Sequence, residues 1–179
     1  MTQPENEVGK TAMSVAGSLA MAQPGDLAAL RRMTPETGAP LFWRLAARHD
    51  EIARAPERWM QIVRMIAILT PTGAPSPARS VQDDKRPLGA VLCDGGQAGH
   101  IDQPVLSEQR LARLLAARGN TRSDALERAV RMLARRGVKL NVVDLAWAVL
   151  NPAGSARIAQ SYYQRLDQAA ATKTEDVTP

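Results

Sequence analysis

The chain has 179 residues, a length typical of one domain or of two small ones. Apolar residues make up 45% and charged residues 23%, a balance that supports a packed core and excludes wholesale disorder. The net charge of +5 is the excess of 23 basic over 18 acidic residues, and nineteen of the basic residues are arginines. This excess predicts a polyanionic or acidic partner, although a GC-rich genome would also enrich arginine. Aromatic residues make up only 3%, too few for the base-stacking platforms of many single-strand binding proteins.

The N-terminal half has the periodicity of helices. Residues 1–22 are predicted to form an N-terminal extension with a weak first helix over 8–22, and a short helix follows through Arg32. Pro40 and Pro56 each stand where a helix is expected to begin, because proline fits the first helical turn. The helix after Pro56 is apolar nearly all round, which is typical of a central core helix.

Two breaks interrupt the middle of the chain. Residues 71–87 hold four prolines and few large apolar side chains, which predicts a polar loop. A glycine-rich stretch over 95–100 follows and is our candidate domain boundary. Beyond it, Ser107, Thr121 and Asn141 each precede a periodic run as helix caps do, and Pro152 or Ser155 is expected to begin a final helix that ends at about Ala169.

These elements predict an all-α protein of two small helical bundles joined by a short linker. The expected divisions are the extension at 1–22, an N-terminal bundle at 23–100 with its loop at 71–87, a C-terminal bundle with a basic face at 101–169, and a disordered tail at 170–179. The longest apolar stretch, Met65 to Leu69, is too short to cross a membrane, and the start of the chain lacks the basic region of a secretory signal. We therefore expect a soluble, cytoplasmic protein.

The positive charge is concentrated in the second half of the chain. Residues 101–170 have a net charge of +5, whereas residues 31–100 have +3 and both ends are negative. In a helix over 123–136, Arg128, Arg131 and Arg135 fall on the face opposite the apolar one, rising roughly 5 Å per step. Arg136 and Lys139 extend this face, and the preceding helix adds Arg110 and Arg113.

An ordinary solvated face is the competing interpretation. Asp124 can pair with Arg128, and Glu127 with Arg131, each four residues apart on the helix. Arg64 lies within an otherwise apolar helix, so it either pairs with a carboxylate, such as Glu57 or Asp50, or reaches the rim of the core with its stem buried; we expect the pair.

The candidate catalytic and metal-binding residues are isolated in the sequence. His49 and His100 lie far apart without a partner at metal-ligand spacing, and Cys93 lies on an apolar segment, as a buried thiol does. Gly95-Gly96-Gln97 matches the tripeptide of release factors without their sequence context. We expect no enzymatic activity, no metal, no cofactor and no small-molecule substrate.

Several blocks of the chain, taken in order, carry a resemblance. They are Gly25-Asp26-Leu27-Ala28-Ala29-Leu30-Arg31-Arg32, Phe42-Trp43-Arg44-Leu45, the helix 59–69, Leu88-Gly89, Ser107-Glu108-Gln109-Arg110-Leu111, and a final helix with Arg157, Tyr162 and Tyr163. Their order and spacing over residues 8–168 resemble the small subunit of the type I-E CRISPR Cascade surveillance complex, the CasB family.

The resemblance implies a non-catalytic, all-helical subunit. In that family two copies contact the backbone subunits and the large subunit, and their basic surfaces hold DNA strands opened by guide-RNA pairing, which stabilises the R-loop. The partners it implies are therefore those Cascade subunits, a second copy of the chain, target DNA and guide RNA. It assigns nucleic-acid contacts to Arg32, Arg110, Arg128 and Arg157, whereas Arg113, Arg131, Arg135 and Arg136 rest on the distribution of charge described above. The alternative is a helical interaction module that binds an acidic protein and never contacts nucleic acid.

Overall fold

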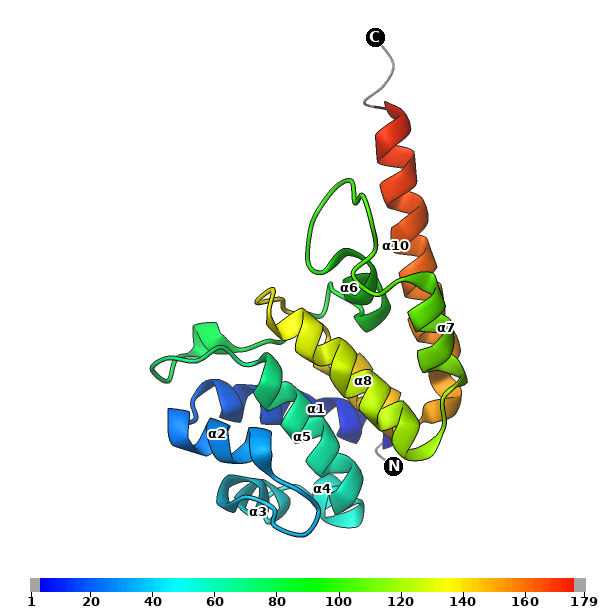
Figure 1. Cartoon of the computed structure of the whole chain (residues 1–179). Helices are drawn as coiled ribbons and strands as arrows, with labels where there is room; N and C mark the ends of the chain where they lie inside the picture. Colours follow the sequence, from blue (N-terminus) through cyan, green and yellow to red (C-terminus); the bar gives the residue numbers. More distant parts are fainter. Residues whose placement is uncertain (1–3, 176–179) are drawn as a thin grey trace.

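In the computed structural model, residues 4–175 are described, and they form an all-α protein (Figure 1). An isolated bridge between Gln82 and Leu140 is the only β pairing within this range. The helices are α1 (Pro4–Ala20), α2 (Pro24–Arg32), α3 (Pro40–Ala46), α4 (Asp50–Arg54), α5 (Pro56–Leu69), α6 (Leu88–Asp94), α7 (Glu108–Ala116), α8 (Gly119–Ala134), α9 (Val142–Leu150) and α10 (Ser155–Glu175). Two short 3-10 helices, Pro77–Arg79 and Pro152–Gly154, complete the list.

Local signals set most of the helix starts. Proline opens α3 and α5 as predicted, since it lacks the N–H group that the first turn leaves unpaired. Ser107 and Asn141 accept hydrogen bonds from the backbone N–H groups of Arg110 and Val143, which confirms both as caps.

The start predicted at Thr121 is wrong. Helix α8 begins at Gly119, because Arg118 turns back to close α7 and Gly119 takes a left-handed conformation with φ +53°. The Arg118 guanidinium donates to the carbonyl groups of Leu115, Ala116 and Ala117, the last carbonyls of the α7 turn. The start of α8 therefore depends on an arginine side chain and not on a threonine cap.

The core is centred on α5, as its sequence predicted. Trp59, Ile62, Val63 and Ile66 are fully buried, and α5 packs against α2, α8 and α9. Helix α1 also packs against α9, so buried side chains form one cluster from Val8 to Ala169. The two predicted bundles contact each other through the pairs α5–α8, α5–α9 and α1–α9. The domain boundary expected near residue 100 stays a prediction.

Helix α10 packs closely against α6. A Cβ atom at Gly89 would lie 2.1 Å from the Ile158 carbonyl oxygen, so only glycine allows this approach. The Tyr162 hydroxyl donates to the Leu106 carbonyl at 2.6 Å, which joins α10 to the segment before α7. Helix α10 ends at Glu175 and not at Ala169. The disordered tail expected over residues 170–179 is therefore helical from 170 to 175, and residues 176–179 lie outside the described range.

Within the described residues, no helix has the length and apolar character needed to span a bilayer.

Candidate nucleic-acid interface

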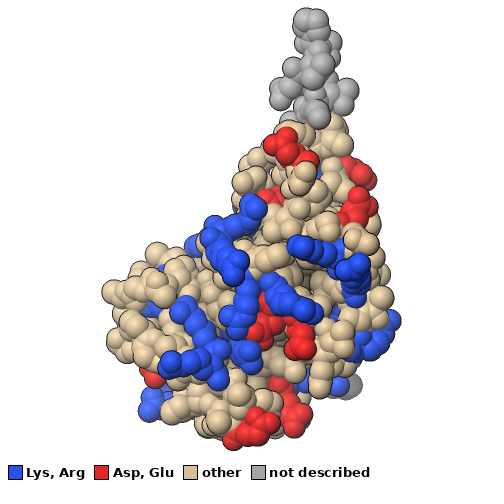
Figure 2. Space-filling view, viewed as in Figure 1, with Lys and Arg blue, Asp and Glu red and all other residues tan. Residues whose placement is uncertain are grey.

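Helix α8 has one buried face and one basic face, as its periodicity predicted. Leu126, Ala129, Val130 and Leu133 are buried, and Arg128 and Arg131 are exposed. Figure 2 shows Lys and Arg side chains gathered over this side of the molecule, with acidic side chains among them. The helix ends at Ala134, so Arg135 and Arg136 lie just beyond its last turn, before a left-handed turn at Gly137 with φ +63°.

Glu127 joins α8 to α5. Its carboxylate accepts from Arg64 at 2.9 Å and from Arg131 at 2.7 Å, so the pair predicted between Glu127 and Arg131 is confirmed. The expectation that Arg64 pairs with Glu57 or Asp50 is wrong, because the packing of α8 on α5 brings Glu127 closer. The pair considered between Asp124 and Arg128 does not form, since Arg128 has no ion pair within the described residues.

A first groove lies where the C-terminal ends of α5 and α8 meet. It has a volume of about 490 Å³, and its charged lining consists of Arg31, Arg131 and Arg135, with no acidic residue among the lining groups. Since Arg131 uses Nε and Nη2 for Glu127, its Nη1 is available to another acceptor.

Arg31 is fixed in place by the C-terminal end of α5. Its Nε donates to the Ala67 carbonyl at 2.8 Å and its Nη2 to the Thr70 carbonyl at 2.6 Å. Burial, and then the charge of Arg79, lower the pKa of Arg31 below its usual value. The neighbouring Arg32, which the sequence singled out, is exposed, so the structure separates a half-buried arginine from a solvent-facing one.

A second groove of about 560 Å³ lies on the other side of Gly137. Arg136, Lys139 and Arg86 supply its positive charge, and Asp83 is its one acidic lining residue. Because Gly137 lines both grooves, Arg135 and Arg136 diverge at the end of α8 and each contributes to a different groove.

The remaining predicted residues lie outside both grooves. Arg110 and Arg113 are exposed on α7, and Arg157 is exposed on α10. Arg157 has an acidic neighbour, since its Nη2 lies 3.6 Å from Asp144. The structure thus brings Arg131 and Arg135 together with Arg31, and places Arg136 in the adjoining groove.

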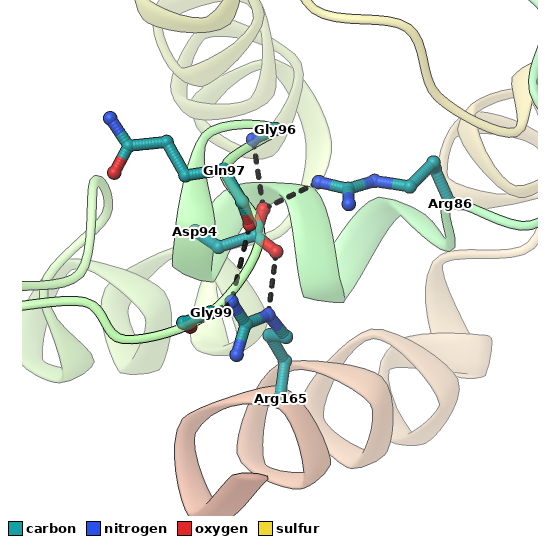
Figure 3. A network of polar contacts seen from close by, with 6 residues as sticks. All are labelled: Arg86, Asp94, Gly96, Gln97, Gly99 and Arg165. Carbon is teal, nitrogen blue, oxygen red and sulfur yellow. Dashed lines mark hydrogen bonds and ion pairs between the residues drawn. The ribbon is translucent and has the colours of Figure 1, made fainter. Parts of the chain in front are cut away.

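Two further arginines hold the loop after α6 (Figure 3). The Asp94 side chain is 1% exposed and accepts from Arg86 Nη2 at 2.9 Å, Arg165 Nε at 2.6 Å and the Gly96 amide at 2.8 Å. Arg165 also donates to the carbonyl groups of Gln97 and Gly99. We name this network the Asp94 clamp. It ties the loop 95–99 to α10. The one signal of this network in the local sequence was an acidic residue between an apolar helix and two glycines.

The surroundings of the cysteine and of the two histidines are those of structural residues. Cys93 is buried, and burial, with the charge of Asp94, raises the pKa of its thiol to about 11. His49 lies 3.1 Å from the Ser14 hydroxyl, and His100 lies 3.3 Å from the Asp102 carboxylate. Among the described residues, no three His, Cys, Asp or Glu side chains are grouped as a metal site requires.

Comparison with protein families gives one result. The family model described as CRISPR-associated protein Cse2 matches residues 26–163, most of the chain and all of α3 to α9. Comparisons with curated proteins and with solved structures give no significant match.

Proposed function

Because the chain belongs to the CRISPR-associated protein Cse2 family, structural small subunits of the type I-E Cascade complex, we propose that it holds nucleic-acid backbones within that complex. Its ligands would be the DNA strands separated by guide-RNA pairing, and its contacts would stabilise the R-loop. Its neighbours would be the backbone and large subunits and a second copy of the chain.

The single observation that carries this proposal is the first groove. Arg31 from α2, Arg131 from α8 and Arg135 just beyond α8 line it, and no carboxylate is among the lining residues. Glu127 binds Nε and Nη2 of Arg131, so Nη1 remains for a phosphate. Arginine binds phosphate oxygens through several N–H groups at once, and such contacts carry no base information.

The second groove extends this surface past the end of α8. A strand that crosses Gly137 would pass from Arg135 to Arg136 and Lys139 without meeting a large side chain at the crossing point. Since exchange between a DNA duplex and an RNA–DNA hybrid is nearly balanced, a few such contacts are enough to favour the open state.

A titration of the protein with single-stranded oligonucleotides of two unrelated sequences tests the proposal. The groove variant is the double substitution Arg131→Gln and Arg135→Gln. The matched control is Arg44→Gln with Arg48→Gln, two exposed arginines outside both grooves that give the same change in net charge.

We expect both sequences to bind with similar affinity, and affinity to fall as salt rises. The groove variant should reduce the slope of log K against log salt by about 1.4, from roughly 0.7 for each phosphate contact on a single strand. The control should leave the slope unchanged. Equal effects of the two variants would show that the groove is not the binding surface, and an absence of binding by the parent would favour the acidic protein partner.

A further inference from the structure

A separate positively charged pocket lies at the opposite end of α8 from the two grooves. It has a volume of about 240 Å³ and is formed where the first turns of α5 and α8 meet the last turn of α9. Its polar lining includes Arg58, Gln61, Gly119, Asn120 and Arg122. Because α8 has 16 residues, this pocket lies about 24 Å along the helix from Arg135.

The first turn of α8 presents unused hydrogen-bond donors to this pocket. The backbone N–H groups of Gly119, Asn120 and Thr121 have no acceptor within the described residues, and the N-cap residue Arg118 supplies no side-chain cap. The first turn also holds no acidic residue. Such a helix end attracts anions through its free N–H groups and its dipole.

Arg122 is a second and independent feature of the same pocket. It is only 4% exposed and lines the pocket, and its Nε has no hydrogen-bond partner within the described residues. Its Nη1 donates to the Leu114 carbonyl at 3.2 Å, which fixes the guanidinium. A buried charged group with an unused donor is costly unless an acceptor reaches it.

The charges around the pocket are predominantly positive. Arg118 lies close enough to lower the pKa of Arg122 further, after the larger effect of burial. Arg58 is exposed and donates to the Leu150 carbonyl at 3.1 Å. Glu57 is the one acidic lining residue, and it is exposed and has no ion pair within the described residues. Cations at a helix N-terminus oppose the helix dipole, and a bound anion would relieve this.

We propose that the pocket binds a phosphate group, held by the free amides of Gly119 and Asn120 and by the Arg122 side chain. We further assign this phosphate to a nucleic-acid strand that spans α8 from the first groove, a step that rests on the proposed function. A free phosphate ion would use the same donors, so the test includes both sources.

The first measurement follows the amide signals of the ¹⁵N-labelled protein during addition of inorganic phosphate, against chloride at the same ionic strength. We expect a saturable shift of the Gly119 and Asn120 amides with phosphate alone. The second measurement adds a single-stranded oligonucleotide, which should shift the same amides together with those of Arg131 and Arg135.

The variant Asn120→Asp places a carboxylate in the first turn of α8, where it favours the helix and competes with phosphate. It should weaken phosphate binding by roughly 5-fold to 1,000-fold, the range that one unit charge about 4 Å away gives between bulk water and a protein surface. The control Gln160→Glu adds the same charge at an exposed position of α10 that does not line the pocket and should have no such effect.

Each outcome is decisive. If neither ligand shifts the pocket amides, the site does not exist, and shifts at Arg131 and Arg135 with the oligonucleotide would leave the proposed function intact. If inorganic phosphate shifts them and the oligonucleotide does not, the pocket holds free phosphate and the strand assignment is wrong. Equal binding by Asn120→Asp and Gln160→Glu would also overturn the site.

Discussion

Replacement of Asp94 by asparagine tests the clamp on the loop after α6. The asparagine keeps the size of the side chain but removes the charge that compensates Arg86 and Arg165. It also turns one of two acceptor oxygens into a donor that faces an arginine or the Gly96 amide.

The magnitude follows from burial. Breaking a buried ion pair by removing one partner costs about 3–5 kcal/mol, and the side chains of Arg86 and Arg165 are 26% and 13% exposed, so water can solvate them in part. We therefore expect a loss of about 3 kcal/mol in the free energy of unfolding. For a chain of this size, that is a fall of roughly 6–12 °C in Tm.

Thermal and urea unfolding of Asp94→Asn provides the assay, with Asp102→Asn as the control. The Asp102 side chain is 97% exposed and, among the described residues, pairs with His100 alone at 3.3 Å, so its replacement should change stability by less than about 0.5 kcal/mol. Hydrogen exchange at Gly96, Gln97 and Gly99 should accelerate in Asp94→Asn alone. Equal stability of the two variants would refute the clamp as a stabilising element.

Three other predictions follow from packing and charge. Gly89→Ala should lower stability by about 1–3 kcal/mol because its Cβ would meet the backbone of α10, whereas Gly17→Ala, with nothing within 4 Å, should raise it by about 0.5–1 kcal/mol; unfolding curves that move in the same direction would contradict this. Since its pKa is about 11, Cys93 should resist iodoacetamide at pH 8 and react once the protein is unfolded, with the thiolate fraction rising only as the pH approaches 11; rapid labelling of the folded protein would show that the thiol is accessible. Glu127→Gln should tighten oligonucleotide binding by freeing Arg131, at a stability cost of up to about 1 kcal/mol because the pairs are partly exposed; weaker oligonucleotide binding would be inconsistent with the groove.

The sequence was most informative where the determining interaction is local. The starts at Pro40 and Pro56 and the caps at Ser107 and Asn141 depend on residues within one turn, so they could be predicted. The start of α8 was missed although its contacts are also local, because Arg118 bonds to carbonyls one to three residues before it, a contact that a search for Ser, Thr, Asp or Asn caps does not detect.

The candidate site also has one part that the local sequence predicts and another that it does not. Helical periodicity was enough to place Arg128 and Arg131 on the exposed face of α8. The grooves and the partner of Arg64 required contacts between distant segments, since Arg64 and Glu127 are 63 residues apart. Periodicity also could not separate Arg31 from Arg32, because only the carbonyl groups at the end of α5 decide which of the two is fixed against the protein.

The lifetime of an R-loop in a reconstituted type I-E Cascade complex tests the central claim most directly. Complexes would be assembled with the parent chain, with the Arg131→Gln and Arg135→Gln variant, or with the Arg44→Gln and Arg48→Gln control, and checked for equal incorporation of the subunit. We predict that the groove variant shortens the R-loop lifetime while the control matches the parent. An unchanged lifetime with the groove variant would contradict the account.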